Sequence, residues 1–137
     1  MTLGSHLKYT AAASTIMLAF CNLQQILWFA IGSILIDADH YIFYAVKCRK
    51  FDIMGMFAYY DMLTREKDKI TYLGVFVFHT IEFFIVIGIL SLYMPLMFYL
   101  LCGMIFHYIL DIIYLYKIKC VALRAYSLIQ GFIYYIR

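Results

Sequence analysis

Long apolar runs separated by short polar breaks dominate this chain. Residues 70–93 and 95–116 are two such runs, and each is long enough, at about 1.5 Å of rise per residue, to cross a hydrocarbon core about 30 Å thick. Residues 11–46 are too long for one span and just long enough for two, with the stretch CNLQQ as the polar interruption. The pattern therefore predicts four transmembrane helices, over residues 7–21, 25–46, 70–93 and 95–116.

Composition places the chain among membrane proteins. Of its 137 residues, 66% are hydrophobic and 14% are charged, whereas about a quarter of the residues of a typical soluble domain are charged. A bundle of four helices uses nearly all of this length and leaves no room for a separate soluble module. We predict an all-α fold, a polytopic membrane bundle in which residues 1–137 form one integral-membrane domain.

Basic residues flank the predicted spans and indicate their orientation. Because positive charge gathers on the cytoplasmic side of a membrane, both termini are predicted to be cytoplasmic, and residues 47–69 and 120–137 to form short amphipathic segments at that surface. The net charge of +3 is small, and the basic residues lie beside apolar segments and do not form a continuous tract, so nucleic acid is not an expected partner. The residues concerned are Lys47, Arg49, Lys50, Arg65, Lys67, Lys69, Lys117, Lys119 and Arg124.

Ionisable side chains interrupt three of the four predicted spans. Asp37, His79 and His107 each lie ten residues from a flanking lysine, about 15 Å along a helix axis, so three helices present ionisable groups at one depth. Within each helix these groups come in pairs three or four residues apart, a spacing that puts both members on one face. The pairs are Asp37 with His40, His79 with Glu82, and His107 with Asp111.

Asp39 does not fit this spacing. Two residues turn a regular helix by about 200°, which would point Asp39 away from Asp37. Two explanations are open. Either the helix is unwound between Asp37 and His40, as backbone that lines a polar cavity can be, or Asp39 hydrogen-bonds the second ring nitrogen of a histidine ligand.

Together these side chains predict a metal site. A single histidine in an apolar span is normally a hydrogen-bonded packing residue, but each aspartate at the centre of a membrane helix costs about 2.5–3.5 kcal/mol. A bound cation would neutralise the whole group. The predicted ligands are Asp37, Asp39, His40, His79, Glu82, His107 and Asp111.

The ligand types narrow the choice of metal. Mixed imidazole and carboxylate ligands favour zinc, with manganese, iron or cobalt as alternatives. A zinc ion takes four ligands, fewer than the residues available here. The sequence therefore predicts one or two divalent ions, with Asp39 or Asp111 as the bridging carboxylate where there are two.

Three blocks of the sequence resemble a known membrane family. Taken in order along the chain, these blocks resemble the motifs P-D-x-D-H, T-H-S and G-x-x-x-H-x-x-x-D. These motifs belong to the small integral-membrane metal-dependent hydrolases, a family that includes the LexA-binding inner-membrane-associated hydrolases. The chain departs from these motifs with Ile36 in place of proline and with HTIE in place of T-H-S. Ser5-His6 looks like an early T-H element of the family, which makes His6 an extra candidate ligand. The blocks are GSILIDADH (residues 32–40), His79-Thr80 and GMIFHYILD (residues 103–111).

The resemblance implies a metal-dependent hydrolase embedded in a bacterial or archaeal cytoplasmic (inner) membrane. Water activated by the metal would attack a phosphoester or another ester of a lipid or lipid-linked substrate, with Glu82 or Asp39 as a catalytic carboxylate. Membrane lipid is the expected partner. Arg49, Lys50 and Arg65, near the cytoplasmic mouth, are candidates to hold its head group.

A function of another class is a metal-ion transporter, or a metal-binding membrane protein without catalysis. The same side chains would then form a transient site on an ion path, or a site that only stabilises the bundle. Four short helices without an inverted repeat make alternating access awkward, so we rank the transporter second. The sequence leaves open whether the bundle forms a homo-oligomer.

Overall fold

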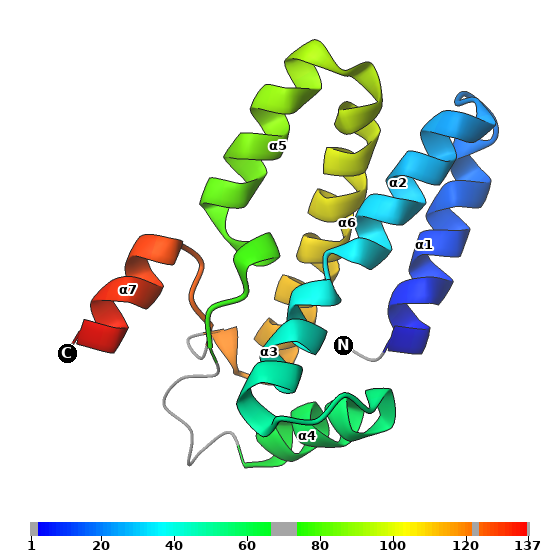
Figure 1. Ribbon diagram of the computed structural model, residues 1–137. Coiled ribbons are helices and arrows are strands. Elements are labelled where there is room, and N and C mark those ends of the chain that lie inside the picture. Colours follow the sequence, from blue (N-terminus) through cyan, green and yellow to red (C-terminus); the bar gives the residue numbers. More distant parts are fainter. Residues whose placement is uncertain (1–2, 67–73, 122–123, 137) are drawn as a thin grey trace.

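Helices are the regular elements of the described fold. The computed structural model describes residues 3–66, 74–121 and 124–136, and within these ranges it contains helices and no strand, which confirms the all-α class. Figure 1 shows α2 between α1 and α6, with α5 against the other side of α6. The elements are α1 (Leu3–Met17), α2 (Leu23–Leu35), α3 (Ala38–Cys48), α4 (Ile53–Arg65), the 3-10 turn η2 (Val77–His79), α5 (Ile81–Tyr93), α6 (Pro95–Lys117) and α7 (Leu128–Ile136).

The two uncharged breaks become capped turns at the same end of the bundle (Figure 1). At the start of α2, the Asn22 side chain accepts from the Gln25 backbone N–H at 3.0 Å, and the Gln25 side chain accepts from the Asn22 N–H at 2.9 Å. This reciprocal capping satisfies donors that a helix start leaves free. Pro95 opens α6, a position where its fixed φ suits the helix and its missing N–H costs nothing.

Two helical stretches are long and apolar enough to cross a membrane, Leu23–Cys48 and Pro95–Lys117. Helix α5 is apolar but has 13 residues, about 20 Å of helix. The helix predicted over residues 70–93 is wrong in its first part: residues 74–76 are not helical and η2 precedes α5, while residues 67–73 lie outside the described residues. The first predicted helix, 7–21, is also displaced, because α1 begins and ends four residues earlier.

A break between α2 and α3 interrupts the helix predicted over residues 25–46. Asp37 donates its backbone N–H to the Ile34 carbonyl at 3.3 Å, and the Asp37 carbonyl accepts from the His40 N–H at 3.1 Å. Hydrogen bonds with this three-residue spacing wind the backbone more tightly than an α-helix. The break lies beside the segment 37–40, where the sequence left an unwound helix open as one explanation for Asp39, and it changes the direction of the side chains that follow it.

Close backbone contact between α2 and α6 forms the centre of the fold, and it is the most extensive contact between described helices. Two glycines allow it. A Cβ atom at Gly32 would overlap the Leu100 carbonyl, and one at Gly103 would overlap the Phe29 carbonyl. The two helices therefore touch through their backbones, which brings the next turns of both into contact.

The segments beyond α3 and α6 carry further helices. Helix α4 lies in the segment 47–69 and α7 in the segment 120–137. The Asp52 carboxylate caps α4, accepting from the Gly55 N–H at 2.7 Å and from the Tyr44 hydroxyl at 3.0 Å. The hydrogen bond from Tyr44 lowers the pKa of Asp52, which keeps this cap ionised. Helix α7 exposes most of its apolar side chains at the edge of the fold (Figure 1).

Replacing Gly103 with alanine is expected to destabilise the bundle by about 1–3 kcal/mol, because the added methyl group would overlap the α2 backbone. The matched control is Gly88→Ala on α5, where the nearest atom, Leu101 Cδ2, is 4.0 Å away and alanine favours the helix. Thermal unfolding in detergent should give a lower Tm for Gly103→Ala and an equal or higher Tm for Gly88→Ala. Equal Tm values for both variants would contradict the close α2–α6 contact.

Candidate metal centre

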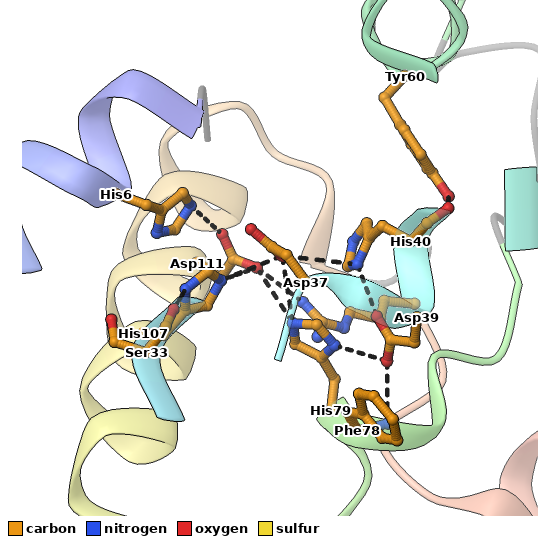
Figure 2. A network of polar contacts seen from close by, with 11 residues as sticks. His6, Ser33, Asp37, Asp39, His40, Tyr60, Phe78, His79, His107 and Asp111 are labelled. Atoms are coloured by element: carbon orange, nitrogen blue, oxygen red, sulfur yellow. Dashed lines mark hydrogen bonds and ion pairs between the residues drawn. The ribbon is translucent and has the colours of Figure 1, made fainter. Parts of the chain in front are cut away.

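Four ligand atoms converge where the α2–α3 break, η2 and the middle of α6 meet (Figure 2). Asp37 comes from the break, His79 ends η2, and His107 and Asp111 lie one turn apart on α6. One ligand atom of each residue lies within 4.8 Å of the other three. This group, which we call the four-ligand group, could hold a metal ion.

The spacing within the four-ligand group suits a four-coordinate ion. His107 Nε2 lies 3.2 Å from Asp37 Oδ1 and 3.7 Å from Asp111 Oδ2. His79 Nε2 lies 3.8 Å from each of the same two oxygens. In a tetrahedral zinc site with bonds of about 2.0–2.1 Å, neighbouring ligand atoms are about 3.3 Å apart. Small inward shifts would therefore bring all four atoms into coordination distance.

Hydrogen bonds on the opposite edge of each imidazole fix the orientation of the two rings. His107 donates from Nδ1 to the Ser33 carbonyl at 2.6 Å, and His79 donates from Nδ1 to Asp39 Oδ2 at 3.0 Å. A neutral imidazole carries a single N–H, so each Nε2 presents a lone pair. Neither Nε2 atom has a hydrogen-bond partner among the residues that the structure describes.

Four electron-pair donors thus face one another in the interior. The side chains of His79 and His107 are fully buried, and that of Asp111 is 9% exposed. Buried polar atoms that lack a partner are costly, and carboxylates close to nitrogen lone pairs repel them. A divalent cation would bind both unpartnered Nε2 atoms and balance the charge of the two carboxylates. Metal-binding histidines typically donate their other ring N–H to a carboxylate or backbone carbonyl, as both rings do here.

Asp39 supports the four-ligand group from outside. One of its oxygens lies 2.8 Å from His40 Nδ1, while the other accepts from His79 Nδ1 and from the Phe78 backbone N–H at 2.9 Å. Asp39, His40 and His79 form a second compact group, but ordinary hydrogen bonds already join its members. Both explanations left open by the sequence apply, because the helix is broken before Asp39 and Asp39 holds a histidine by its second nitrogen.

His40 lies between aromatic residues at the more open side of the site. Phe76 stacks on its ring with centroids 4.1 Å apart, and the Tyr60 hydroxyl donates to the His40 carbonyl at 2.9 Å. Burial raises the pKa of Tyr60, so the hydroxyl keeps the proton for this hydrogen bond. The side chains of His40 and Asp37 are 21% and 29% exposed, which makes them the accessible edge.

His6 also reaches the site, from α1. Its Nε2 lies 3.1 Å from Asp111 Oδ1, and its ring stacks on His107 with centroids 3.9 Å apart. The other Asp111 oxygen belongs to the four-ligand group. His6 is therefore placed to orient the Asp111 carboxylate, and it lies beside the four ligands rather than among them (Figure 2).

Glu82 lies away from both groups of candidate ligands. Its carboxylate accepts from the Ser127 hydroxyl and from the Leu128 N–H at 3.0 Å, at the start of α7. The pairing predicted with His79 assumed one continuous helix, whereas His79 ends η2 and Glu82 lies in the first turn of α5. This arrangement argues against Glu82 as a ligand or catalytic carboxylate.

The basic residues predicted to hold a lipid head group lie on the surface. Arg49 and Lys50 are exposed in the connection between α3 and α4. Arg65 is 78% exposed on α4 and pairs with Asp61 at 2.8 Å. Their contact with lipid stays a prediction.

Arg124 is a residue of the site that the sequence did not single out. It is 4% exposed, and its Nη1 lies 3.4 Å from Asp111 Oδ2. In the sequence it follows the fourth predicted span together with Lys117 and Lys119, as a topology signal would. No motif distinguishes it from its exposed neighbours, and only the return of the chain after α6 brings it to Asp111.

Comparison of the chain with protein-family models, curated proteins and solved structures finds no match. The resemblance to the integral-membrane hydrolases therefore rests on the three sequence blocks and remains a prediction. Those blocks supply the four residues that the fold brings together. The geometry of these residues is the basis for a functional proposal.

Replacing Asp39 with asparagine is expected to weaken zinc binding about 10–100-fold, because an amide cannot accept hydrogen bonds at both ends as this carboxylate does. Glu82→Gln is the matched control and should keep the wild-type affinity for zinc, since the Glu82 carboxylate accepts a hydrogen bond at the start of α7 and not from a residue of the site. Competition with a chromophoric chelator in detergent measures both affinities. A loss of similar size in Glu82→Gln would contradict these assignments.

Proposed function

We propose that the chain is a membrane-embedded, metal-dependent hydrolase that acts on an ester or phosphoester of a lipid or lipid-linked substrate. One observation carries the proposal: two buried histidine Nε2 atoms face two carboxylates and have no hydrogen-bond partner in the described part of the chain. A cation bound between these atoms would pair with both carboxylates and with both nitrogen lone pairs. Histidine and carboxylate ligands of this kind hold the divalent ions of many hydrolases.

Asp37, His79, His107 and Asp111 would hold one ion, with zinc favoured and manganese, iron or cobalt as alternatives. When bound, the ion supplies an activated water and polarises the oxygen of an ester or phosphoryl group. The Asp37 side chain is 29% exposed, against 9% or less for the other three ligands. Substrate and water would therefore reach the site on the side of Asp37.

His40 is our candidate proton acceptor in place of Glu82. Asp39 accepts from its Nδ1 at 2.8 Å, which leaves Nε2 as the ring nitrogen that would accept a proton. The same Nδ1 lies 3.6 Å from Asp37 Oδ1, which places the ring beside the accessible edge of the site. Asp39 would thus support two histidines, one that binds the ion and one that accepts a proton.

The membrane arrangement we propose has four crossings, made by α1, the α2–α3 stretch, α5 and α6. Two features support it: both uncharged turns lie at one end of the bundle (Figure 1), and α5 exposes large apolar side chains, such as Ile85 at 54% and Val86 at 53%. Both termini and the metal site would then lie in the cytoplasmic half of a bacterial or archaeal cytoplasmic membrane.

A metal-binding membrane protein without catalysis is the second candidate. One observation favours it: four protein ligands already complete a tetrahedral zinc site, whereas catalytic zinc sites keep a position open. For hydrolysis, Asp37 would have to leave room for water, which its place in the break and its exposure favour.

Elemental analysis of the purified protein in detergent tests the site first. We expect about one metal ion per chain for a single four-ligand site, with most of it lost in Asp37→Ala and in His107→Ala. The control Asp61→Ala removes an exposed carboxylate of α4 and should keep the metal. A folded wild-type protein without metal would contradict the proposal.

Hydrolysis of lipid esters and phosphoesters by the metal-loaded protein then tests catalysis. His40→Gln should retain the metal and lose about 100-fold or more in kcat, as expected for a lost proton acceptor. Stoichiometric metal without hydrolysis of any lipid tested would instead support the second candidate.

A further inference from the structure

Arg124 is a buried guanidinium with unused hydrogen-bond donors. It is 4% exposed, and its Nη1 lies 3.4 Å from Asp111 Oδ2. Within the residues that the structure describes, its Nε and Nη2 atoms have no hydrogen-bond partner. These two nitrogens share one edge of the guanidinium, the edge that binds carboxylate or phosphate oxygens through two parallel hydrogen bonds.

Asp111 is shared too widely to neutralise Arg124. Its Oδ1 faces His6 at 3.1 Å, and its Oδ2 faces His79 at 3.8 Å and His107 at 3.7 Å. Were an ion bound there, its two positive charges would be balanced by Asp37 and Asp111, and the third carboxylate of the site, Asp39, bonds to His40 and His79 and not to Arg124. A buried charge of this kind is stable when an anion pairs with it.

Two aromatic rings hold the guanidinium in place. Its central carbon lies 5.5 Å from the ring centroid of Tyr108 and 5.8 Å from that of Phe76. Cation–π contacts restrict the orientation of the side chain without using its N–H donors. Arg124 is therefore fixed beside the four-ligand group with one edge ready to bind.

The ring of Tyr108 also lines an apolar groove between α5 and α6. The groove has a volume of about 240 Å³, and its other lining residues are Ile81, Phe84 and Ile105. Ile81 and Ile105 are 56% and 42% exposed, so the groove lies at the outer surface of the bundle. Tyr108 thus contacts both a positive charge and a hydrocarbon surface, a combination that is complementary to a molecule with an anionic head and an alkyl chain.

We infer that Arg124 and this groove bind a phosphorylated amphiphile, with phosphoryl oxygens on Nε and Nη2 and the alkyl chain against Phe84 and Ile105. This inference rests on the proposed function and narrows its substrates from lipid esters in general to lipids with a phosphoryl group. Nη1, on the other side of the guanidinium from this edge, lies 3.4 Å from Asp111 Oδ2, so Arg124 would stand between the bound anion and the four-ligand group.

Calorimetric titration of the purified protein with decyl phosphate, decanoate and inorganic phosphate tests this site, in zinc-loaded and in chelator-treated protein. Decyl phosphate should bind most tightly, and Arg124→Gln should weaken its binding about 10-fold or more, as for other buried charged partners. The affinity of Arg124→Lys for decyl phosphate should lie between those of the wild type and Arg124→Gln, because lysine keeps the charge but cannot form the two parallel hydrogen bonds of a guanidinium. The control Lys117→Gln removes an exposed cation at the end of α6 and should bind as wild type.

A second variant separates the groove from the charge. Ile105→Trp fills the groove, and it should weaken the binding of decyl phosphate while leaving the binding of inorganic phosphate unchanged. If inorganic phosphate binds as tightly as decyl phosphate, the inference that the ligand carries an alkyl chain is overturned. If decanoate binds as tightly as decyl phosphate, the inferred preference for a phosphoryl group is overturned.

The metal content of each variant keeps this inference distinct from the proposed function. Arg124→Gln should retain zinc, and a variant that loses zinc along with decyl phosphate would make Arg124 a support of the metal site and overturn its role in binding. Arg124-dependent binding in the chelator-treated protein would uphold the anion site even if the wild type shows no hydrolysis. Unchanged decyl phosphate binding in Arg124→Gln would overturn the inference even if hydrolysis is found.

Discussion

The hydrogen bond from His107 Nδ1 to the Ser33 carbonyl determines how the candidate metal centre is built. At 2.6 Å it keeps the ring proton on Nδ1 and leaves a lone pair on Nε2, the nitrogen that faces the carboxylates. The carbonyl is free to accept it because the break after α2 directs the Asp37 N–H to Ile34 instead. The two groups can meet because Gly103, one turn before His107, lets the backbones of α2 and α6 touch. The position of the His107 ring thus depends on both the break after α2 and the glycine at position 103.

The sequence was sufficient for the parts of the structure that depend on local chemistry. The helix predicted from residue 95 begins there, at Pro95, and the polar stretch CNLQQ contains Asn22, the cap of α2. The residues of the four-ligand group were identifiable because ionisable side chains are rare in apolar runs. Two of the predicted spans correspond to stretches long and apolar enough to cross a membrane.

The remainder depends on contacts between distant residues, which spacing along the chain does not reveal. Apolar composition around Gly74 resembles helix, yet its φ of 134° and the hydrogen bond from the Phe78 N–H to Asp39 produce an irregular segment that ends in a 3-10 turn. Pairing His79 with Glu82 by helical periodicity therefore failed. The burial of Arg124 likewise follows from a contact with Asp111, thirteen residues earlier in the chain, and not from its neighbours in sequence.

The distribution of the site along the chain has a consequence for how the protein folds. The polar network joins side chains from His6 to Arg124, so segments from α1 to the chain after α6 contribute to it. Membrane helices insert before they pack against one another, so in the membrane arrangement proposed above ionisable groups such as Asp111 would enter hydrocarbon ahead of their partners. Assembly of the bundle and capture of an ion would accordingly be a single event, in which the ion holds the helices together at the moment they meet. Supply of metal during membrane insertion would then govern how much of the chain reaches its folded form.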